Sequence, residues 1–309
     1  VLCNLDSNDD LETISCRQFD MYASPDIPET VFAINSDGSE KWSTNLNPGN
    51  DGESVMGTPV VVDVTGDATP EVLVCTSTSP PLIQSHDDHS IYCDGRLYLL
   101  SGSTGNILHT SSVVGKHVYG SPVVGDIDND SSLEVVISCF MNAGGLVKTY
   151  VFSLPTLTLE HSWSLPGVVG SMSSATIGDI DNSGSVDVVV SGLNTVYAWD
   201  GITKQPLLGF DPPVNIGGCA RHGISLADID GDDFLEIVLC TTSGYLTALN
   251  HDGSNCGGFP IYIGNSMSQP AIDDIDGDGR LEICVTNTLG EIIVYEAGDS
   301  SWPALLTWP

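Results

Sequence analysis

The chain has 309 residues, of which 41 are acidic and only 8 are lysine or arginine, so its formal net charge at pH 7 is -33. Such an acidic protein repels nucleic acid and anionic membranes, which excludes both as expected partners. Hydrophobic residues make up 41% of the chain, 33 glycines and 17 prolines interrupt short apolar runs, and no run approaches the roughly 20 residues that span a bilayer, so the composition predicts a globular all-β protein with no membrane span in this segment.

The predicted elements recur as units of four short strands, with an acidic loop between the first strand and the second. In the second unit we expect strands over Pro59–Val64, Glu71–Thr76, Leu97–Leu100 and Ile107–Ser112. In the fourth unit we expect them over Ala175–Ile180, Asp187–Ser191, Thr195–Trp199 and Pro206–Phe210. The last unit ends with strands over Glu291–Glu296 and Leu305–Trp308.

Turn signals separate these strands. Asp-Gly pairs occur at Ser36-Asp37-Gly38 and at His251-Asp252-Gly253, each between two runs rich in β-branched residues. No segment has a convincing helical pattern.

Six loops carry oxygen-bearing side chains at the first, third, fifth and ninth positions, usually in a frame resembling G-D-I-D-G-D-x-x-L-E. On a tight loop, alternate residues can bring their oxygens to one hard cation, and calcium prefers six to eight oxygen ligands. Twenty of the 41 acidic residues lie at these positions, so the net charge is largely metal-site chemistry. We therefore predict about five to six Ca²⁺ sites. The predicted ligands, loop by loop, are Asn4, Asp6, Asn8 and Glu12; Asp63, Thr65, Asp67 and Glu71; Asp126, Asp128, Asp130 and Glu134; Asp179, Asp181, Ser183 and Asp187; Asp228, Asp230, Asp232 and Glu236; Asp274, Asp276, Asp278 and Glu282.

The loops differ in charge, and the number of carboxylates helps to set calcium affinity. The third, fifth and sixth loops have four carboxylates and are predicted to bind most tightly, whereas the second and fourth have three. The first loop has Asn4 and Asn8 in place of aspartates and is predicted to be the weakest or empty.

The spacing of the loops predicts the fold. They begin near residues 4, 63, 126, 179, 228 and 274, which is 59, 63, 53, 49 and 46 residues apart, about the length of a propeller blade. A four-stranded unit cannot bury both faces alone, so copies stack, and radial closure protects their edges. The sequence predicts a single β-propeller domain over residues 1–309 with six four-stranded blades. The alternatives are a seventh blade lost by trimming, or an open arc completed by a neighbouring subunit.

Two segments carry a family resemblance most clearly, Gly120–Asp128 (GSPVVGDID) and Gln269–Gly279 (QPAIDDIDGDG). Through them the whole chain resembles the FG-GAP/VCBS repeat family, the calcium-loop β-propellers related to the integrin α-subunit head. It departs from that pattern in lacking Phe-Gly before these strands and in having six repeats where integrin-like heads have seven. The resemblance implies a calcium-binding propeller. It implies function only loosely, because the family includes adhesion proteins, lectin-like binders and some polysaccharide lyases.

Nine cysteines are many for a cytosolic protein. Cys16, Cys75, Cys240 and Cys284 fall on one side of the second strand of their units, which favours small buried hydrophobic residues between blades. The better disulfide candidates are Cys219 with Cys256 and Cys75 with Cys93.

Three further features carry weaker signals. The sequence His86-Asp87-Asp88-His89 has metal-binding residue types, but a solvated loop tip is the favoured interpretation. The one glycosylation sequon, at Asn129, lies inside a calcium loop and is a poor acceptor. The basic pairs Lys116-His117 and Arg221-His222 precede innermost strands, where a propeller has its axial mouth.

These features favour an extracellular, non-catalytic adhesion or scaffold module stabilised by calcium. Its expected partners are other extracellular proteins or glycans, or further copies of the chain in a homo-oligomer or filament. Val1 is not preceded by an initiator Met or a signal sequence, so we expect a processed or trimmed product that is secreted or held at the cell surface.

Two alternatives stay open. The first is a polysaccharide lyase that uses Arg221, His222 and His117. The second is a lectin that binds sugar on aromatic residues, with core packing as the expected role of these side chains; the candidates are Trp42, Trp163, Trp199 and Trp302.

Overall fold

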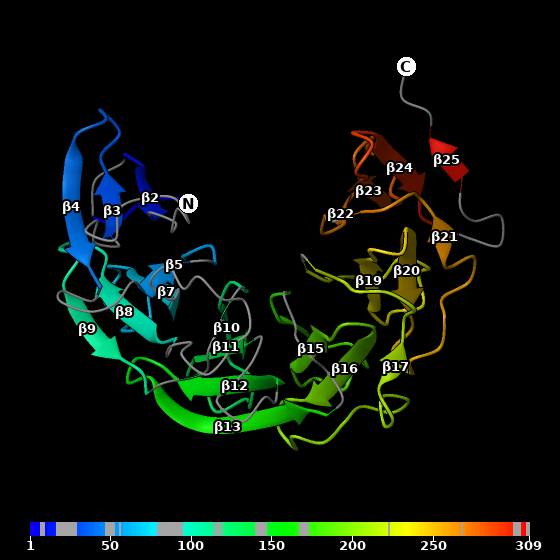
Figure 1. Cartoon of the computed structure of the whole chain (residues 1–309), viewed down its shortest axis with the longest axis horizontal. Coiled ribbons are helices and arrows are strands. Elements are labelled where there is room, and N and C mark those ends of the chain that lie inside the picture. The colour runs from blue at the N-terminus through cyan, green and yellow to red at the C-terminus, as the bar shows by residue number, and fades with distance from the viewer. Residues whose placement is uncertain are drawn as a thin grey trace, which may run out of the picture. The chain divides into compact units, whose positions relative to one another are not determined.

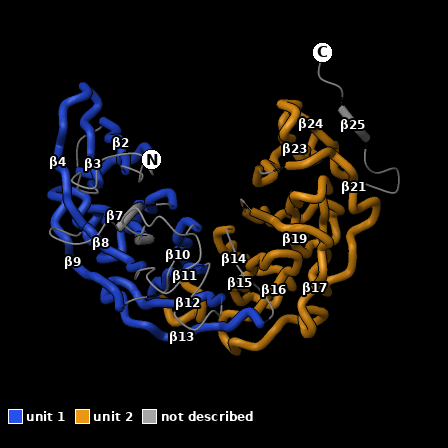
Figure 2. The backbone as a smooth tube through the Cα atoms, in the orientation of Figure 1, with its two compact units in different colours: residues 1–125, 132–170 blue, residues 126–131, 171–309 orange. Residues whose placement is uncertain are grey.

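The computed structural model of the chain describes residues 1–6, 10–16, 30–46, 53–55, 57–78, 95–112, 114, 118, 120–139, 147–166, 173–221, 223–266, 268–298 and 304–306. Within these ranges every regular secondary-structure element is a β-strand, as the sequence predicts (Figure 1). Accordingly, none of these residues belongs to a helix that could cross a membrane. The chain divides into two compact units, one of residues 1–125 and 132–170 and the other of residues 126–131 and 171–309 (Figure 2).

The first unit contains three antiparallel sheets whose strands largely follow chain order. The first sheet joins β1 (Leu2–Cys3), β2 (Glu12–Cys16), β3 (Thr30–Ile34) and β4 (Glu40–Asn45). The second sheet joins β5 (Glu53–Val55), β7 (Glu71–Thr78), β8 (Leu97–Ser101) and β9 (Ile107–Thr110), and β6 (Val60–Val62) also pairs with β7. The third sheet joins β10 (Val123–Gly125), β11 (Glu134–Cys139), β12 (Val147–Ser153) and β13 (Thr158–Leu165).

The second unit contains three further sheets of the same pattern. The fourth sheet joins β14 (Thr176–Gly178), β15 (Asp187–Ser191), β16 (Thr195–Asp200) and β17 (Val214–Asn215). The fifth sheet joins β18 (Ser225–Ala227), β19 (Glu236–Cys240), β20 (Tyr245–Leu249) and β21 (Ile261–Tyr262). The sixth sheet joins β22 (Ala271–Asp273), β23 (Glu282–Thr286), β24 (Ile292–Glu296) and β25 (Ala304–Leu306).

Strand β19 shows why the second strands have unbroken apolar sequences. All five of its residues are buried. Successive side chains of a strand point to opposite faces. Ile237 and Leu239 accordingly belong to a core shared with the fourth sheet, whereas Val238 and Cys240 belong to a core shared with the sixth sheet. A sheet buried on both faces needs apolar residues at every position of its central strands.

The first unit repeats this arrangement at β7. Val72 and Val74 lie in a core with residues of the first sheet, and Leu73 and Cys75 lie in a core with residues of the third sheet. The prediction that four-stranded units stack face to face is therefore confirmed within each unit.

Most predicted strands are confirmed, and β15 has the predicted bounds, Asp187–Ser191. The predicted fourth strand at Pro206–Phe210 is wrong, because the strand is Val214–Asn215. Pro206 makes only an isolated bridge to Trp199. Proline has no N–H to donate to a ladder, and Gly209, at φ +84°, turns the chain away soon afterwards.

Three of the four tryptophans considered as sugar-binding candidates are core residues, and the fourth, Trp302, lies outside the described residues. Trp42, Trp163 and Trp199 are only 8%, 6% and 6% exposed. The indole Nε1 of Trp42 donates a hydrogen bond to the carbonyl of Gly102 at 2.7 Å. Core packing, which the sequence favours over a sugar-binding role, is therefore confirmed for these three.

Both predicted disulfides are wrong. Cys219 and Cys256 are free thiols, and so is Cys75, whose Sγ lies 3.2 Å from the carbonyl oxygen of Gly120; Cys93 lies outside the described residues. The prediction of buried, hydrophobic cysteines is confirmed for Cys75 and Cys240, which are 1% and 4% exposed. Cys16 and Cys284 are only half-buried.

The two-sided burial of β19 predicts a large cost for a cavity there. We expect Ile237→Ala to lower the free energy of unfolding by about 2–5 kcal/mol, because Ile237 is fully buried. Ile202→Ala is the matched control: Ile202 is 47% exposed, so its truncation should cost less than about 0.5 kcal/mol. Denaturant unfolding at saturating calcium measures both values, and equal losses would contradict the assigned core.

Candidate metal sites

Each acidic loop connects two consecutive strands that pair with each other, β6 and β7 in the second sheet and the first and second strands in the other sheets, and the ladder fixes its two ends. In the third loop β10 ends at Gly125, β11 begins at Glu134, and these two residues are cross-strand partners. The same pairing joins Gly178 to Asp187, Ala227 to Glu236 and Asp273 to Glu282. The hairpin register therefore brings the first ligand, which follows the first strand, to the ninth, which begins the second.

Two positions of the loop have left-handed backbone. The fourth position has positive φ in loops two to six, at Gly66, Asn129, Asn182, Gly231 and Gly277. The sixth position does so as well, at Ala68, Ser131, Gly184, Asp233 and Gly279. Glycine and asparagine tolerate this conformation best. It is strained for Ala68 and Ser131, and such strain persists only where the surroundings impose it.

The first-position aspartate imposes this shape by accepting backbone N–H groups. Asp228 Oδ1 accepts from Gly231 at 2.7 Å and from Asp232 at 3.1 Å, and its Oδ2 accepts from Asp233 at 3.1 Å. Asp274 accepts from the corresponding three N–H groups at 2.7, 3.1 and 3.0 Å. The same carboxylate that would bind metal thus also folds the loop.

The ninth-position acid is buried in all six loops, between 0% and 5% exposed. In the first, second, fourth, fifth and sixth loops, one of its oxygens accepts the N–H of the second loop residue. In the fourth, fifth and sixth loops these bonds are 2.8, 2.8 and 2.7 Å long, from Ile180 to Asp187, Ile229 to Glu236 and Ile275 to Glu282. This bond fixes the position of the carboxylate beside the loop.

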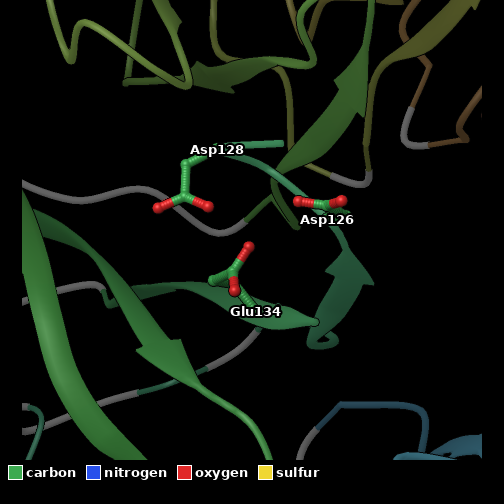
Figure 3. Close-up of side chains that lie close together, drawn as sticks. All are labelled: Asp126, Asp128 and Glu134. Carbon is green, nitrogen blue, oxygen red and sulfur yellow. The ribbon is translucent and has the colours of Figure 1, made fainter. Parts of the chain in front are cut away.

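Four loops bring three carboxylates together. In each, one oxygen from the first, third and ninth positions lies within 4.8 Å of the other two. Figure 3 shows the third loop, where the carboxylates of Asp126, Asp128 and Glu134 converge. The other three groups are Asp179, Asp181 and Asp187; Asp228, Asp230 and Glu236; and Asp274, Asp276 and Glu282.

The donor set fits a hard cation. Asp187 Oδ1 and Asp128 Oδ1 are buried and have no hydrogen-bond partner. A buried carboxylate oxygen left without a partner is costly, and a bound cation would remove that cost. All the converging atoms are carboxylate oxygens, which is the ligand chemistry of calcium or magnesium rather than of thiophilic metals.

The fifth-position aspartates do not belong to these close groups. Asp232 Oδ1 accepts the N–H of Phe234 at 3.0 Å, and Asp278 Oδ1 accepts that of Arg280 at 2.9 Å. Asp67 is turned in the same way, toward the N–H of Thr69 at 2.8 Å. These side chains would have to rotate to reach an ion held by the other three.

The first two loops also differ from the other four. The second loop has Thr65 at its third position, and its carboxylates Asp63, Asp67 and Glu71 are not among the close groups of the described residues. In the first loop Lys41 forms ion pairs with Asp6 and Glu12. The hydrogen bond with Asp6 is the main cause that raises the pKa of Lys41. Asn4 accepts the N–H of Asp6 at 3.1 Å, and Asn8 lies outside the described residues.

Burial changes the acidity of the ninth-position acids. It raises the pKa of Asp187 to about 7, and the negative charges of Asp181, Asp200 and Asp179 raise it further, against a lowering by the N–H of Ile180. Burial likewise raises the pKa of Glu236 to about 7, with added repulsion from Asp230, Asp232 and Asp228. In the metal-free protein these carboxyls are therefore partly protonated at neutral pH.

Sequence reasoning missed two neighbours of the loops. Cys256 Sγ lies 3.8 Å from Asp230 Oδ2, and burial followed by the charges of Glu236 and Asp230 raises the pKa of this thiol to about 12. Lys41 is the other. Lys41 lies on β4, and Cys256 lies between β20 and β21. Neither belongs to the loop that it contacts, so no spacing within a loop could have indicated them.

The other candidate groups contribute less. Arg221 is exposed, whereas His222, His117, Lys116 and the His86–His89 segment lie outside the described residues. Asn129 Nδ2 donates to the carbonyl of Gly184, at 3.1 Å. The side chain of the one glycosylation sequon, in the third loop, is thus bonded to the backbone of the fourth loop.

No family model and no curated protein matches the chain. Solved structures do match it at low identity. The rhamnogalacturonan lyase PL11 of Bacillus licheniformis is 16% identical with a TM-score of 0.59, covering 99% of this chain and 56% of that one. The structure named Dos1 propeller is 14% identical with a TM-score of 0.60, covering 97% and 67%. The biofilm matrix protein Bap1 of V. cholerae is 17% identical with a TM-score of 0.55, covering 99% and 50%.

These similarities show the fold alone. The all-β architecture of four-stranded antiparallel sheets is that of β-propellers. The chain spans 56%, 63% and 56% of the length of the three rhamnogalacturonan lyases that it matches.

The raised pKa values predict how pH affects the metal-free protein. Because Asp187 and Glu236 keep their protons up to about pH 7 when folded, but lose them near the ordinary value of about 4 when unfolded, their contribution to stability is fully present below about pH 4 and is lost as the pH rises through about 7. We therefore expect the calcium-stripped protein to melt at a higher temperature at pH 5 than at pH 8.

The net charge of -33 produces a trend of the same sign, so matched variants are needed. Asp187→Asn and Glu236→Gln, together, should reduce the difference in melting temperature between pH 5 and pH 8 in calcium-free buffer. A double variant with the same pH difference as the unmodified protein would show that these two carboxyls are not its cause.

Proposed function

We propose that the chain is an extracellular, calcium-stabilised β-propeller of six blades, of the FG-GAP/VCBS repeat type, that acts as a non-catalytic adhesion or scaffold module. The observation that carries this proposal is Asp187 in the fourth loop. It is fully buried, one oxygen accepts the N–H of Ile180, and the other has no partner within a group of three carboxylates. Such an arrangement is stabilised by a cation.

The position of the loops supports a structural role for that cation. Each loop closes a hairpin. In the fourth and fifth sheets the second strand of that hairpin is buried on both faces. An ion that links both ends of the hairpin would therefore stiffen the strands on which neighbouring sheets pack. Sites of modest affinity are filled at extracellular calcium concentrations, which suits a secreted or cell-surface protein.

The expected partners follow from charge. A net charge of -33 disfavours nucleic acid and favours cationic protein surfaces, calcium-bridged glycans, or other copies of the chain in an oligomer or filament. The similarity to the biofilm matrix protein Bap1 supports an extracellular matrix or adhesion role.

A lyase is the second candidate, and the similarity to three rhamnogalacturonan lyases is the observation that favours it. Arg221 would neutralise the uronate carboxylate, and His222 or His117 would serve as the base that removes the α-proton. A lectin that binds glycans without turnover is the third candidate function.

Removal of calcium tests the main proposal. Binding to the folded state alone stabilises by about 3 kcal/mol per site at a hundredfold excess over Kd, so excess EGTA should lower the melting temperature strongly. Light scattering on the same samples reports particle size, and a fall in size on chelation would place calcium at a contact between subunits. A melt that does not respond in EGTA, with no calcium found by elemental analysis, would refute the calcium-stabilised module.

Turnover of pectic polysaccharides separates the candidates. We expect no rise in ultraviolet absorbance from unsaturated products when the protein is incubated with rhamnogalacturonan and calcium. A rise that is lost in Arg221→Ala, while the melting temperature is unchanged, would establish the lyase instead. Binding on a glycan array without such a rise would favour the lectin.

A further inference from the structure

The first loop is contacted by a positively charged side chain, that of Lys41. The ammonium group of Lys41, on β4, contacts Asp6 Oδ2 and lies 3.4 Å from Glu12 Oε1. Asp6 and Glu12 occupy the third and ninth positions, which supply two of the three converging carboxylates in the third to sixth loops. The Lys41 side chain is 14% exposed and that of Glu12 is 1% exposed, so this is a largely buried pair.

The contact uses the oxygen that lacks a partner in the fourth loop. Glu12 Oε2 accepts the N–H of Leu5 at 2.8 Å, just as Asp187 Oδ2 accepts that of Ile180. The remaining oxygen of Asp187 has no partner, whereas the remaining oxygen of Glu12 is bonded to Lys41. The ammonium group therefore satisfies the ninth-position acid, the role that we assign to calcium in the later loops.

A bulge in the backbone places Lys41. Ala33 pairs with Trp42 and Ile34 with Glu40, which leaves Lys41 as the extra residue of β4. The second and third sheets have the same irregularity, and the extra residues there are Leu108 and Glu160. Both are exposed, and neither is a cation. Of these three equivalent bulge positions, only that of the first sheet supplies a positive charge.

The sequence of the first loop is also poorer for calcium. Asn4 and Asn8 are neutral, which leaves two carboxylates at the four ligand positions, and both are paired with Lys41. The fourth position, left-handed and Gly or Asn in loops two to six, is Ser7 here. Calcium would have to displace an ammonium group from a buried glutamate while gaining only two charged ligands.

We propose that the first loop is not a calcium site, because the ammonium group of Lys41 holds the cation position, so that the first hairpin is stabilised without metal while the later hairpins depend on calcium. This inference rests on the proposed function in that the later loops bind calcium. Calcium removal would then loosen the sheets unequally.

Calcium counting on variants that keep Lys41 tests the inference. Asp6→Asn and Asp276→Asn are matched, because both residues occupy the third position of their loops. We expect Asp6→Asn to bind as many calcium ions per chain as the unmodified protein, and Asp276→Asn to bind one fewer, by equilibrium dialysis with elemental analysis. If both variants lose one ion, the Lys41 inference is overturned and the proposed function stands. If neither loses an ion, the calcium role fails and the inference fails with it.

Replacement of the lysine provides a second, independent readout. Lys41→Met removes the charge and keeps the chain length, whereas Lys41→Arg keeps the charge. In calcium-free buffer we expect Lys41→Met to melt at a lower temperature than Lys41→Arg, because Asp6 and Glu12 lose their cation. Added calcium should then narrow that difference, since the vacated position becomes able to bind it. Equal melting temperatures of the two variants with and without calcium would overturn the inference.

Discussion

A buried carboxylate at the start of the second strand of each sheet is the constraint on which the rest of the structure depends. The residue is Glu12, Glu71, Glu134, Asp187, Glu236 or Glu282, and none is more than 5% exposed. Burial of a negative charge is costly unless it is hydrogen-bonded and paired with a cation. In the loops described above, one backbone N–H donates a hydrogen bond to one oxygen of this carboxylate. The second oxygen would need a bound cation or a proton, and in the first sheet Lys41 contacts it.

The same constraint links the loops to the core. The carboxylate is the first residue of a strand whose next residues alternate between two cores, as Ile237 and Val238 do after Glu236. Loosening the loop would free the end of that strand, and with it the packing on both faces. A cation bound at the hairpin and apolar burial in the sheet would thus be two parts of one stabilising arrangement, which supports the proposed structural role of the ion.

The buried free thiols of Cys75 and Cys240 are poorly reactive. Burial raises the pKa of Cys75 to about 12 and that of Cys240 to about 11. The thiolate, which is the reactive form, is therefore scarce at neutral pH. The number of cysteines suggests a disulfide framework. In the second strands, however, Cys75 and Cys240 pack in the cores as small hydrophobic groups.

The sequence by itself determined the strand-loop-strand repeat, the candidate ligands and the class of fold, because these depend on local spacing: residues such as Asp228, Asp230 and Glu236 lie within nine positions of one another. Only the tertiary structure decided which of them meet. Asp232 lies on the same loop but turns to the N–H of Phe234, and Lys41 reaches Asp6 and Glu12 across 35 and 29 residues. It also decided that Cys219 and Cys256 stay apart. Such contacts depend on strand register, bulges and side-chain direction, which arise when the sheet forms and leave no periodic signal in the chain.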